Sequence, residues 1–180
     1  METLKSARLL LRSFAASDAS RVQQLASDPE VALRTANIPY PYPIGGALAW
    51  IEAQARALTE SSTNTWAVCR IAEQDLIGAI ELVLAPSRFE GAVGYWIGRP
   101  FWNQGYASEA LKLVLDFGFS SLKLQTIAAQ FVDRNKASGR VMEKCGLKAV
   151  PELSRTALVR GKMEHLEVRR IAAVDHQRSQ

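Results

Sequence analysis

The chain has 180 residues, of which 48% are hydrophobic and 22% are charged, so its composition is that of a globular protein and not of a disordered or fibrous one. Its 22 lysines and arginines against 18 acidic residues give a formal net charge of +4. This excess suits a protein that binds an anionic ligand and is too small for one that coats nucleic acid. The two cysteines, Cys69 and Cys145, lack metal-ligand spacing, so we predict neither a disulfide framework nor a metal site.

The chain shows no targeting or membrane-spanning pattern. Its first apolar run is three leucines long and ends at Arg12, which is too short for a secretory signal. No segment reaches the ~18 consecutive apolar residues of a transmembrane helix. We therefore expect a cytoplasmic protein without membrane or nucleic-acid partners, with residues 1–173 as one domain and residues 174–180 as a frayed tail.

The first third of the chain is predicted to contain one strand and two helices. Alternating leucines indicate a strand over Arg8–Phe14, and a helix is expected over Ser17–Ser27 with Ser17 as its N-cap. Three prolines exclude regular helix from Asn37–Pro43. Apolar residues at helical spacing indicate a second helix over Ala47–Leu58. Its apolar stripe consists of Leu48, Ile51, Ala55 and Leu58.

Strands dominate the centre of the chain, and helices and strands alternate after it. Short polar links join three central strands and are typical of an antiparallel meander: Thr65–Ile71, Leu76–Leu84 and Ala92–Ile97. The later elements are a helix over Ala107–Gly118, a strand over Leu124–Val132, a helix over Asn135–Lys144 closed by Gly146, and strands over Leu147–Val150 and His165–Ile171. This order predicts an α/β fold of the α+β kind, a mixed sheet with helices on both faces.

The strand, loop and helix over residues 94–118 form the most informative segment. Gly105 and Ala107 stand at the mouth of the expected helix, whose first-turn N–H groups and partial positive charge can hold a phosphate. Small residues let the backbone approach such an anion closely. The segment lacks the lysine of a Walker loop and lacks G-x-G-x-x-G, which argues against nucleotide sites of those types. Taken alone, the pattern also fits an ordinary tight turn.

Two motifs, in this order, resemble the GNAT superfamily of N-acetyltransferases. YWI at 95–97 followed by WNQGYASEAL at 102–111 is similar to that superfamily's acetyl-CoA pyrophosphate loop, and NKASGRVMEKCGL at 135–147 is similar to its N-x-x-[A/S]-…-E-K-x-G-F element. The aromatic-rich first motif, together with RLLLR at 8–12, resembles the Rim-type branch, the ribosomal-protein N-terminal acetyltransferases. The resemblance spans residues 8–171. It implies a GNAT fold with antiparallel N-terminal strands followed by a splayed parallel pair.

The resemblance also implies an acetyl-CoA site between the splayed strands and at the helix that follows. Trp96 and Ile97 would present backbone groups to the pantetheine arm, and loop amides or hydroxyls would hold the pyrophosphate. Trp102 replaces the family's usual Gln or Arg, which removes one side-chain contact but leaves the amides. The implied cofactor-binding residues are Trp96, Ile97, Trp102, Asn103, Gln104, Gly105, Tyr106, Ala107, Ser108, Asn135 and Ser138.

Three residues are candidates for catalysis: Ser138, Glu81 and Asn135. By the resemblance, Asn135 would bond the pantetheine or help close the site, and the alternative is a plain helix N-cap. Ser138 is a candidate general acid for the departing thiolate, because Met142 occupies the family's usual tyrosine position and a thioether cannot donate a proton. Glu81, a lone carboxylate in an apolar strand, is the first candidate base, with His165 second; an outward-facing surface residue is the alternative for both.

The acceptor pocket is the part that the sequence defines least. By family architecture, the early helices and the loop Pro39–Pro43 would build it, with rings and prolines that form a stiff apolar wall or merely pack the loop. Residues 35–50 contain no carboxylate, which favours a peptide or neutral amine over a polycationic drug.

The predicted function is direct transfer of an acetyl group from acetyl-CoA to a primary amine in a ternary complex. An α-amine, with a pKa of about 8, is substantially neutral at working pH and is therefore the preferred acceptor, on a protein or peptide N-terminus. Alternatives are a small amine such as an antibiotic or polyamine, and a non-catalytic acyl-CoA-binding module on the same fold. The expected partners are acetyl-CoA and the amine acceptor, with the protein a monomer or homodimer.

Overall fold

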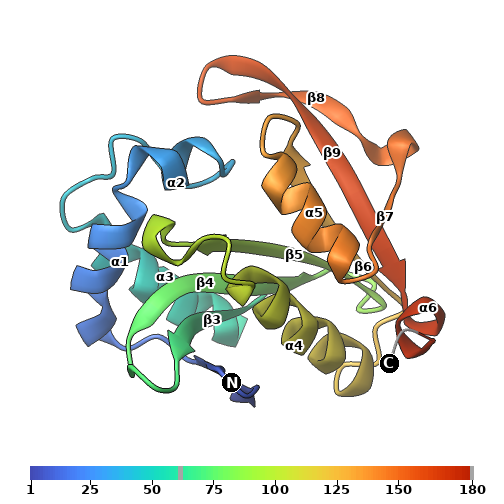
Figure 1. Ribbon diagram of the computed structural model, residues 1–180, viewed down its shortest axis with the longest axis horizontal. Coiled ribbons are helices and arrows are strands. Elements are labelled where there is room, and N and C mark those ends of the chain that lie inside the picture. Colours follow the sequence, from blue (N-terminus) through green and yellow to red (C-terminus); the bar gives the residue numbers. More distant parts are fainter. Residues whose placement is uncertain (61–62, 179–180) are drawn as a thin grey trace.

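The computed structural model describes residues 1–60 and 63–178, and in them nine strands form one mixed sheet (Figure 1). Their order is β1-β2-β3-β4-β5-β6-β9-β7, and β8 pairs with β9 as well. The strands are β1 (Leu4–Lys5), β2 (Leu9–Arg12), β3 (Thr63–Arg70), β4 (Leu76–Leu84), β5 (Glu90–Ile97), β6 (Thr126–Val132), β7 (Lys148–Ala149), β8 (Arg155–Val159) and β9 (Lys162–Ala172).

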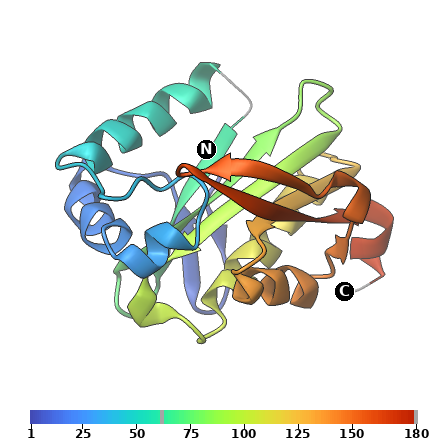
Figure 2. The ribbon, with the colours of Figure 1, turned by 90° about the horizontal axis from the view of Figure 1, so that it is seen from above.

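Helices cover both faces of this sheet, as the order of the predicted elements indicates (Figure 2). The helices are α1 (Ala19–Ala26), α2 (Pro29–Leu33), α3 (Gly46–Glu60), α4 (Tyr106–Ser120), α5 (Lys136–Lys144) and α6 (Ala173–Gln177). Helices α3 and α5 lie on opposite sides of the sheet (Figure 2). The core between α4 and the sheet includes Trp66, whose ring packs edge-on against Phe117 at 5.4 Å between ring centroids.

The parallel pair β5–β6 is hydrogen-bonded over only half of its length. Its register runs from Glu90 opposite Thr126 to Val93 opposite Ala129. Beyond that point β5 continues to Ile97 and β6 to Val132, with no pairing between them. The carboxyl ends of the two strands therefore diverge and leave an opening in the sheet, the expected splay.

The first predicted helix is wrong at its start. Ser17 lies inside a 3-10 turn, Ala16–Asp18, and Asp18 is the N-cap of α1. The Asp18 carboxylate accepts a hydrogen bond from the Ala15 N–H (2.8 Å) and forms an ion pair with Arg12 (2.7 Å). This partly buried ion pair fixes the chain entering the helix, so the Ser17 hydroxyl is not needed as a cap.

The apolar stripe predicted for α3 is also wrong in part. Leu48 is 41% exposed, whereas Ala47 and Ile51 are buried. The ring of Trp50 packs edge-on against Phe14, with 5.0 Å between the ring centroids. These contacts set the rotation of α3 about its axis and direct Leu48 outward.

Four short elements escaped prediction: β1, α2, β8 and α6. Helix α2 has ordinary start signals, because the Asp28 carboxylate accepts the Glu30 N–H (2.8 Å) and Pro29 occupies the first turn. Helix α6 contradicts a frayed tail from residue 174, since His176 is buried and its Nε2 lies 2.6 Å from Asp116 Oδ1 on α4. Residues 179–180 lie outside the described residues. All of the elements that were predicted are present, and each begins and ends within three residues of its expected bounds.

Candidate active site

Two connected hollows lie at the splay of β5 and β6. The first, which we call the cleft, has a volume of about 290 Å³ and is lined by the ends of β5, the loop before α4, and the first turns of α4 and α5. The second, the trench, has a volume of about 810 Å³ and lies over the sheet between α1, α3 and the segment after α2. The residues that line both hollows are Arg34, Thr35, Tyr95, Trp96, Asn135 and Ser138.

The loop before α4 presents a row of free backbone N–H groups to the cleft. Among the described residues, none of the amides of 103–108 donates to a protein acceptor; the first helical bond of α4 runs from the Glu109 N–H to Gly105 O (3.0 Å). Gly105 is the N-cap and has φ +83°, a left-handed conformation that glycine adopts without strain. Free amides at a helix N-terminus fit a pyrophosphate, so the residues present here suit the group that the resemblance implies.

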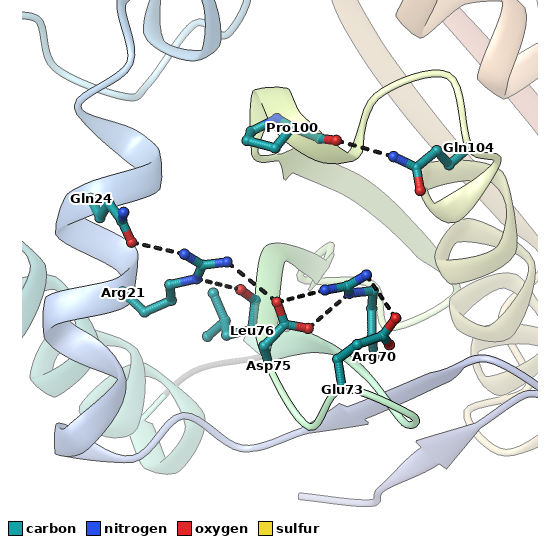
Figure 3. A network of polar contacts seen from close by, with 8 residues as sticks. All are labelled: Arg21, Gln24, Arg70, Glu73, Asp75, Leu76, Pro100 and Gln104. Atoms are coloured by element: carbon teal, nitrogen blue, oxygen red, sulfur yellow. Dashed lines mark hydrogen bonds and ion pairs between the residues drawn. The ribbon is translucent and has the colours of Figure 1, made fainter.

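A polar network lies beside the start of this loop (Figure 3). Asp75 accepts two hydrogen bonds from Arg70 (2.8 and 2.9 Å) and pairs with Arg21 of α1 (3.3 Å). The two guanidinium groups lie against the ring of buried Phe101, at 5.7 Å for Arg21 and 4.9 Å for Arg70. The hydrogen bonds from Arg70 hold the pKa of Asp75 below its ordinary value, with help from the charge of Arg21. Helix α1, the β3–β4 turn and the loop are thereby tied together.

Trp102 belongs to the wall of the cleft and also fixes the end of β5. Its indole N–H donates to Ile97 O (2.6 Å), so that carbonyl is occupied within the protein. The ring lies 5.2 Å from the guanidinium carbon of Arg34, which comes from the C-terminal end of α2. Arg34 pairs with Glu30 (2.9 Å), and its buried Nε has no hydrogen-bond partner in the described part of the chain.

Ser138 lies at the junction of cleft and trench and contacts Tyr95. The Tyr95 hydroxyl lies 2.9 Å from Ser138 Oγ and donates to Ser138 O at 3.2 Å. Burial raises the pKa of Tyr95 well above its ordinary value, an effect that the hydrogen bond to Ser138 partly opposes. Tyr95 therefore keeps its proton and can donate to the serine hydroxyl. Tyr95 belongs to the YWI motif, in which only the backbone groups of Trp96 and Ile97 were predicted to act.

Asn135 is the N-cap of α5, and both ends of its amide are occupied. Its Oδ1 accepts the Ser138 N–H (3.3 Å), and its Nδ2 donates to Arg34 O (2.9 Å). Asn135 thus orients the turn that carries Ser138 and ties α5 to the end of α2. The structure shows the helix N-cap that was the alternative for this residue; a contact with pantetheine and a role in closing the site stay predictions.

Two arginines hold the segment after α2 over the trench. Arg160, at the turn between β8 and β9, donates to Thr35 O (2.7 Å) and to Ile38 O. Arg134 donates to Leu33 O and bonds Glu164 (3.0 Å). Burial lowers the pKa of Arg160 below its ordinary value, and nearby Arg134 adds to this effect. The segment that follows α2 is therefore held in place by two side chains from the other end of the sheet, Arg134 and Arg160.

Glu81 faces the trench, and the surface-facing alternative is wrong for it. It lies opposite Thr65 and Gly94 in the register of the sheet, and Thr65 donates to Gln54 of α3 (2.8 Å), which places this face under α3. A Cβ on Gly94 would come within 2.9 Å of Glu81 Oε1, so the glycine provides room for the carboxylate. Burial raises the pKa of Glu81, and in the described residues its carboxylate has no hydrogen-bond partner.

The structure brings together most of the predicted site residues, with clear exceptions. Gln104 does not line the cleft: its side chain donates back to Pro100 O (3.0 Å; Figure 3). His165, the second candidate base, is exposed and lines neither hollow. Met142, at the family's tyrosine position, is buried in the core. The residues that do line the cleft as predicted are Trp96, Ile97, Trp102, Asn103, Gly105, Tyr106, Ala107, Ser108, Asn135 and Ser138.

Two ionisable groups close to the loop are structural. Burial alone would raise the pKa of Glu109, but hydrogen bonds from Ser6 (2.6 Å) and Arg8 (2.8 Å) bring it below the ordinary value. Cys145 donates to Ser108 O (3.4 Å), and burial raises the pKa of its thiol to about 11, so it stays protonated. Neither side chain lines either hollow.

Comparison with known proteins identifies the family. The model of the acetyltransferase (GNAT) domain matches residues 8–148. A relative from Bacillus subtilis, the uncharacterized N-acetyltransferase YoaA, is 32% identical over 146 residues, which cover 81% of this chain and 82% of YoaA. The chain therefore belongs to the GNAT family of N-acetyltransferases. Its place in the Rim-type branch stays a prediction.

Two solved structures share the fold at low sequence identity. RimL, a ribosomal L7/L12 α-N-protein acetyltransferase in complex with CoA, has a TM-score of 0.83 and is 14% identical, covering 95% of this chain and 98% of RimL. A spermidine N-acetyltransferase from Vibrio cholerae, in complex with CoA and spermine, has a TM-score of 0.80 and is 18% identical, covering 96% and 99% of the two chains. Their names give different acceptors, so the acceptor of this chain has to be argued from its own residues.

No helix in residues 1–60 and 63–178 is long and apolar enough to cross a membrane. Within the same ranges, no three His, Cys, Asp or Glu side chains are grouped so that they could hold a metal ion.

Proposed function

We propose that this N-acetyltransferase moves the acetyl group of acetyl-CoA to the α-amine of a protein or peptide, by direct attack and within a single domain. The observation that supports this best is the junction of cleft and trench at Tyr95, Trp96 and Ser138. A thioester in the cleft and an amine in the trench would meet there, and no acyl-enzyme is required. The inert, protonated thiol of Cys145 fits a route without a cysteine nucleophile.

The cleft suits the donor. The amides of residues 103–108 would hold the pyrophosphate, and the unpaired edge of β5 beyond Val93 would take the pantetheine arm as an added strand. Because Ile97 O already accepts the Trp102 indole, that arm would use the other backbone groups of this edge. Acetyl-CoA supplies the acetyl group as a thioester.

Glu81 and Ser138 each carry out one of the two proton transfers of the reaction. The amine nitrogen forms a bond to the acetyl carbon while the carbon–sulfur bond breaks. Glu81, with its pKa raised by burial, accepts the proton that the amine loses. Ser138 donates its hydroxyl proton to the departing sulfur and regains one from water. Tyr95 hydrogen bonds to Ser138 and fixes the direction of that hydroxyl.

The charges of the trench favour a peptide over a polyamine. Its charged lining side chains are Arg34, Glu81 and Arg155, so guanidinium groups outnumber carboxylates. A polyamine carries several positive charges and would find one carboxylate, whereas a peptide N-terminus carries a single amine. Pro39 and Tyr42 of the loop and Trp50 of α3 supply an apolar wall for peptide side chains.

A thiol-release screen tests this function. The protein is given acetyl-CoA with a set of short peptides, the same peptides blocked at the N-terminus, spermidine and small aminoglycosides. We expect turnover with free peptide N-termini and none with blocked ones. Turnover with polyamines alone would make the chain a small-amine acetyltransferase. Binding of acetyl-CoA without thiol release from any amine would favour a non-catalytic binding module.

A further inference from the structure

The trench extends across the sheet well beyond the reacting centre. Register places Glu81 opposite Gly94, Gln130 opposite Val168, and Arg155 opposite Leu166. All of these residues line the trench. They belong to β4, β5, β6, β9 and β8, so the floor runs from the buried carboxylate to the outer strand.

Arg155 is the positive charge at the far end of this floor. Its side chain is exposed and, within the described residues, has no hydrogen bond, ion pair or ring contact. The other lining arginine, Arg34, pairs with Glu30 and lies against Trp102. Arg134 and Arg160, close by, bond backbone carbonyls or Glu164. Arg155 is therefore the cation of the trench that is available to a bound acceptor.

The separation of Arg155 from Glu81 selects for an extended acceptor. Four strand-to-strand steps, three of about 4.8 Å and a wider one across the splay of β5 and β6, place the two positions on the order of 20 Å apart across the floor. An extended peptide advances about 3.4 Å per residue, so with the α-amine at Glu81 its fourth to sixth residues lie roughly 10–17 Å away. The lengths of the Arg155 side chain and of an acidic side chain cover the remaining distance. The carboxylate of a free amino acid cannot span this distance.

We propose that the acceptor is a peptide N-terminus with an acidic side chain at about the fourth to sixth position, which Arg155 binds. The middle of such a peptide would lie over Gly94 and Gln130, between the sheet and the segment held by Arg160. The inference rests on the proposed function and adds a specificity-determining residue outside the reacting centre. The guanidinium and carboxylate would form a solvent-accessible ion pair, so the effect is moderate and weakens with salt.

The experiment measures kcat/KM for a series of heptapeptides that share the first residue. One peptide has alanine at every other position, and in the rest a single aspartate is moved from position two to position seven. At low salt we expect the wild-type protein to prefer aspartate at positions four to six by about two- to fivefold over the alanine peptide. Arg155→Gln should abolish this preference, and Arg155→Glu should transfer it to peptides with lysine at the same positions.

Lys162→Gln is the matched control, because Lys162 is an exposed cation on the same hairpin that does not line the trench. It should keep the wild-type preference. A flat aspartate scan, or a preference that Arg155→Gln leaves intact, would overturn the role of Arg155 while peptide acetylation stands. If no peptide is acetylated, the proposed function itself fails and this inference with it. Thermal unfolding of each variant checks that the exposed substitutions leave the fold intact.

Discussion

The cleft and the trench share six lining residues, but backbone groups dominate the first and side chains dominate the second. The cleft depends on backbone: free amides of a loop, a glycine in the left-handed region and the open edge of β5. The trench depends on side chains, with the Glu81 carboxylate in its floor, the Arg155 guanidinium at the far end and aromatic rings in its wall. Backbone amides recognise a phosphate whatever side chains surround them, which explains how Trp102 can replace a polar residue there. Side chains can change singly, so the trench is where the acceptor is chosen.

The sharpest test of the trench is Glu81→Gln, which keeps the shape of the side chain and removes its basic site. We expect kcat to fall by about 10²-fold at neutral pH, with loss of the acid limb of the pH–rate profile that reports deprotonation of this carboxyl. Steady-state kinetics from pH 5 to 9 measure both. Glu52→Gln, an exposed carboxylate on α3, should leave the profile unchanged.

The same variant has an opposite effect on stability. Since burial raises the folded-state pKa of Glu81, its ionisation costs stability that is present at low pH and lost as the pH rises through the folded pKa. Glu81→Gln should therefore be about as stable as the parent below pH 4, under the ordinary glutamate pKa of 4.5, and more stable at pH 8, measured by urea unfolding. An activity within about twofold of the parent, with the acid limb retained, would remove Glu81 from the mechanism.

The junction is tested by Ser138→Ala, which should lower kcat by up to about 10²-fold with little change in the KM for acetyl-CoA. Tyr95→Phe should cost about tenfold, because Tyr95 acts through the Ser138 hydroxyl. For the same reason the double variant should be no slower than Ser138→Ala alone. Ser17→Ala, at an exposed serine, is the control. A loss confined to the KM for acetyl-CoA would reduce Ser138 to a binding residue.

The cleft is tested by Gly105→Val. A β-branched residue at φ +83° costs about 1–2 kcal/mol and displaces the amides of the loop, so CoA should bind roughly tenfold more weakly by calorimetry. Gly161→Val is the matched control, because Gly161 has φ +73° and an added Cβ meets nothing within 4 Å. It should lose similar stability and keep its CoA affinity. Equal affinities in the two folded variants would mean that the pyrophosphate does not use this loop.

The same contrast explains what the sequence could and could not predict. The cleft is made of two contiguous motifs, so residues 95–108 and 135–147 were found by reading along the chain, and the meander was found by its alternation. The trench unites Glu81, Gly94, Gln130 and Arg155, which only the strand register brings onto one face. Strand β8 was not predicted, so nothing in the sequence indicated that Arg155 lines the trench. A role for Tyr95 could have been predicted, because its hydroxyl lies in a motif beside the site and needs a hydrogen-bond partner there.

The network around Asp75 should give the smallest effect, and mainly on stability. Asp75→Asn removes the carboxylate that joins Arg21 and Arg70, and we expect a loss of about 1–2 kcal/mol in the free energy of unfolding at pH 7, for a partly exposed pair. Because Arg70 and Arg21 lower the folded-state pKa of Asp75, its stabilisation is complete above the ordinary pKa near 3.8 and is lost as the pH falls through the folded value. The difference between parent and variant should therefore shrink between pH 5 and pH 2 in urea unfolding. Glu73→Gln, which removes only an exposed contact to Arg70, should cost less than about 0.5 kcal/mol. A pH-independent difference would mean that packing around Phe101, and not the ion pairs, holds the loop.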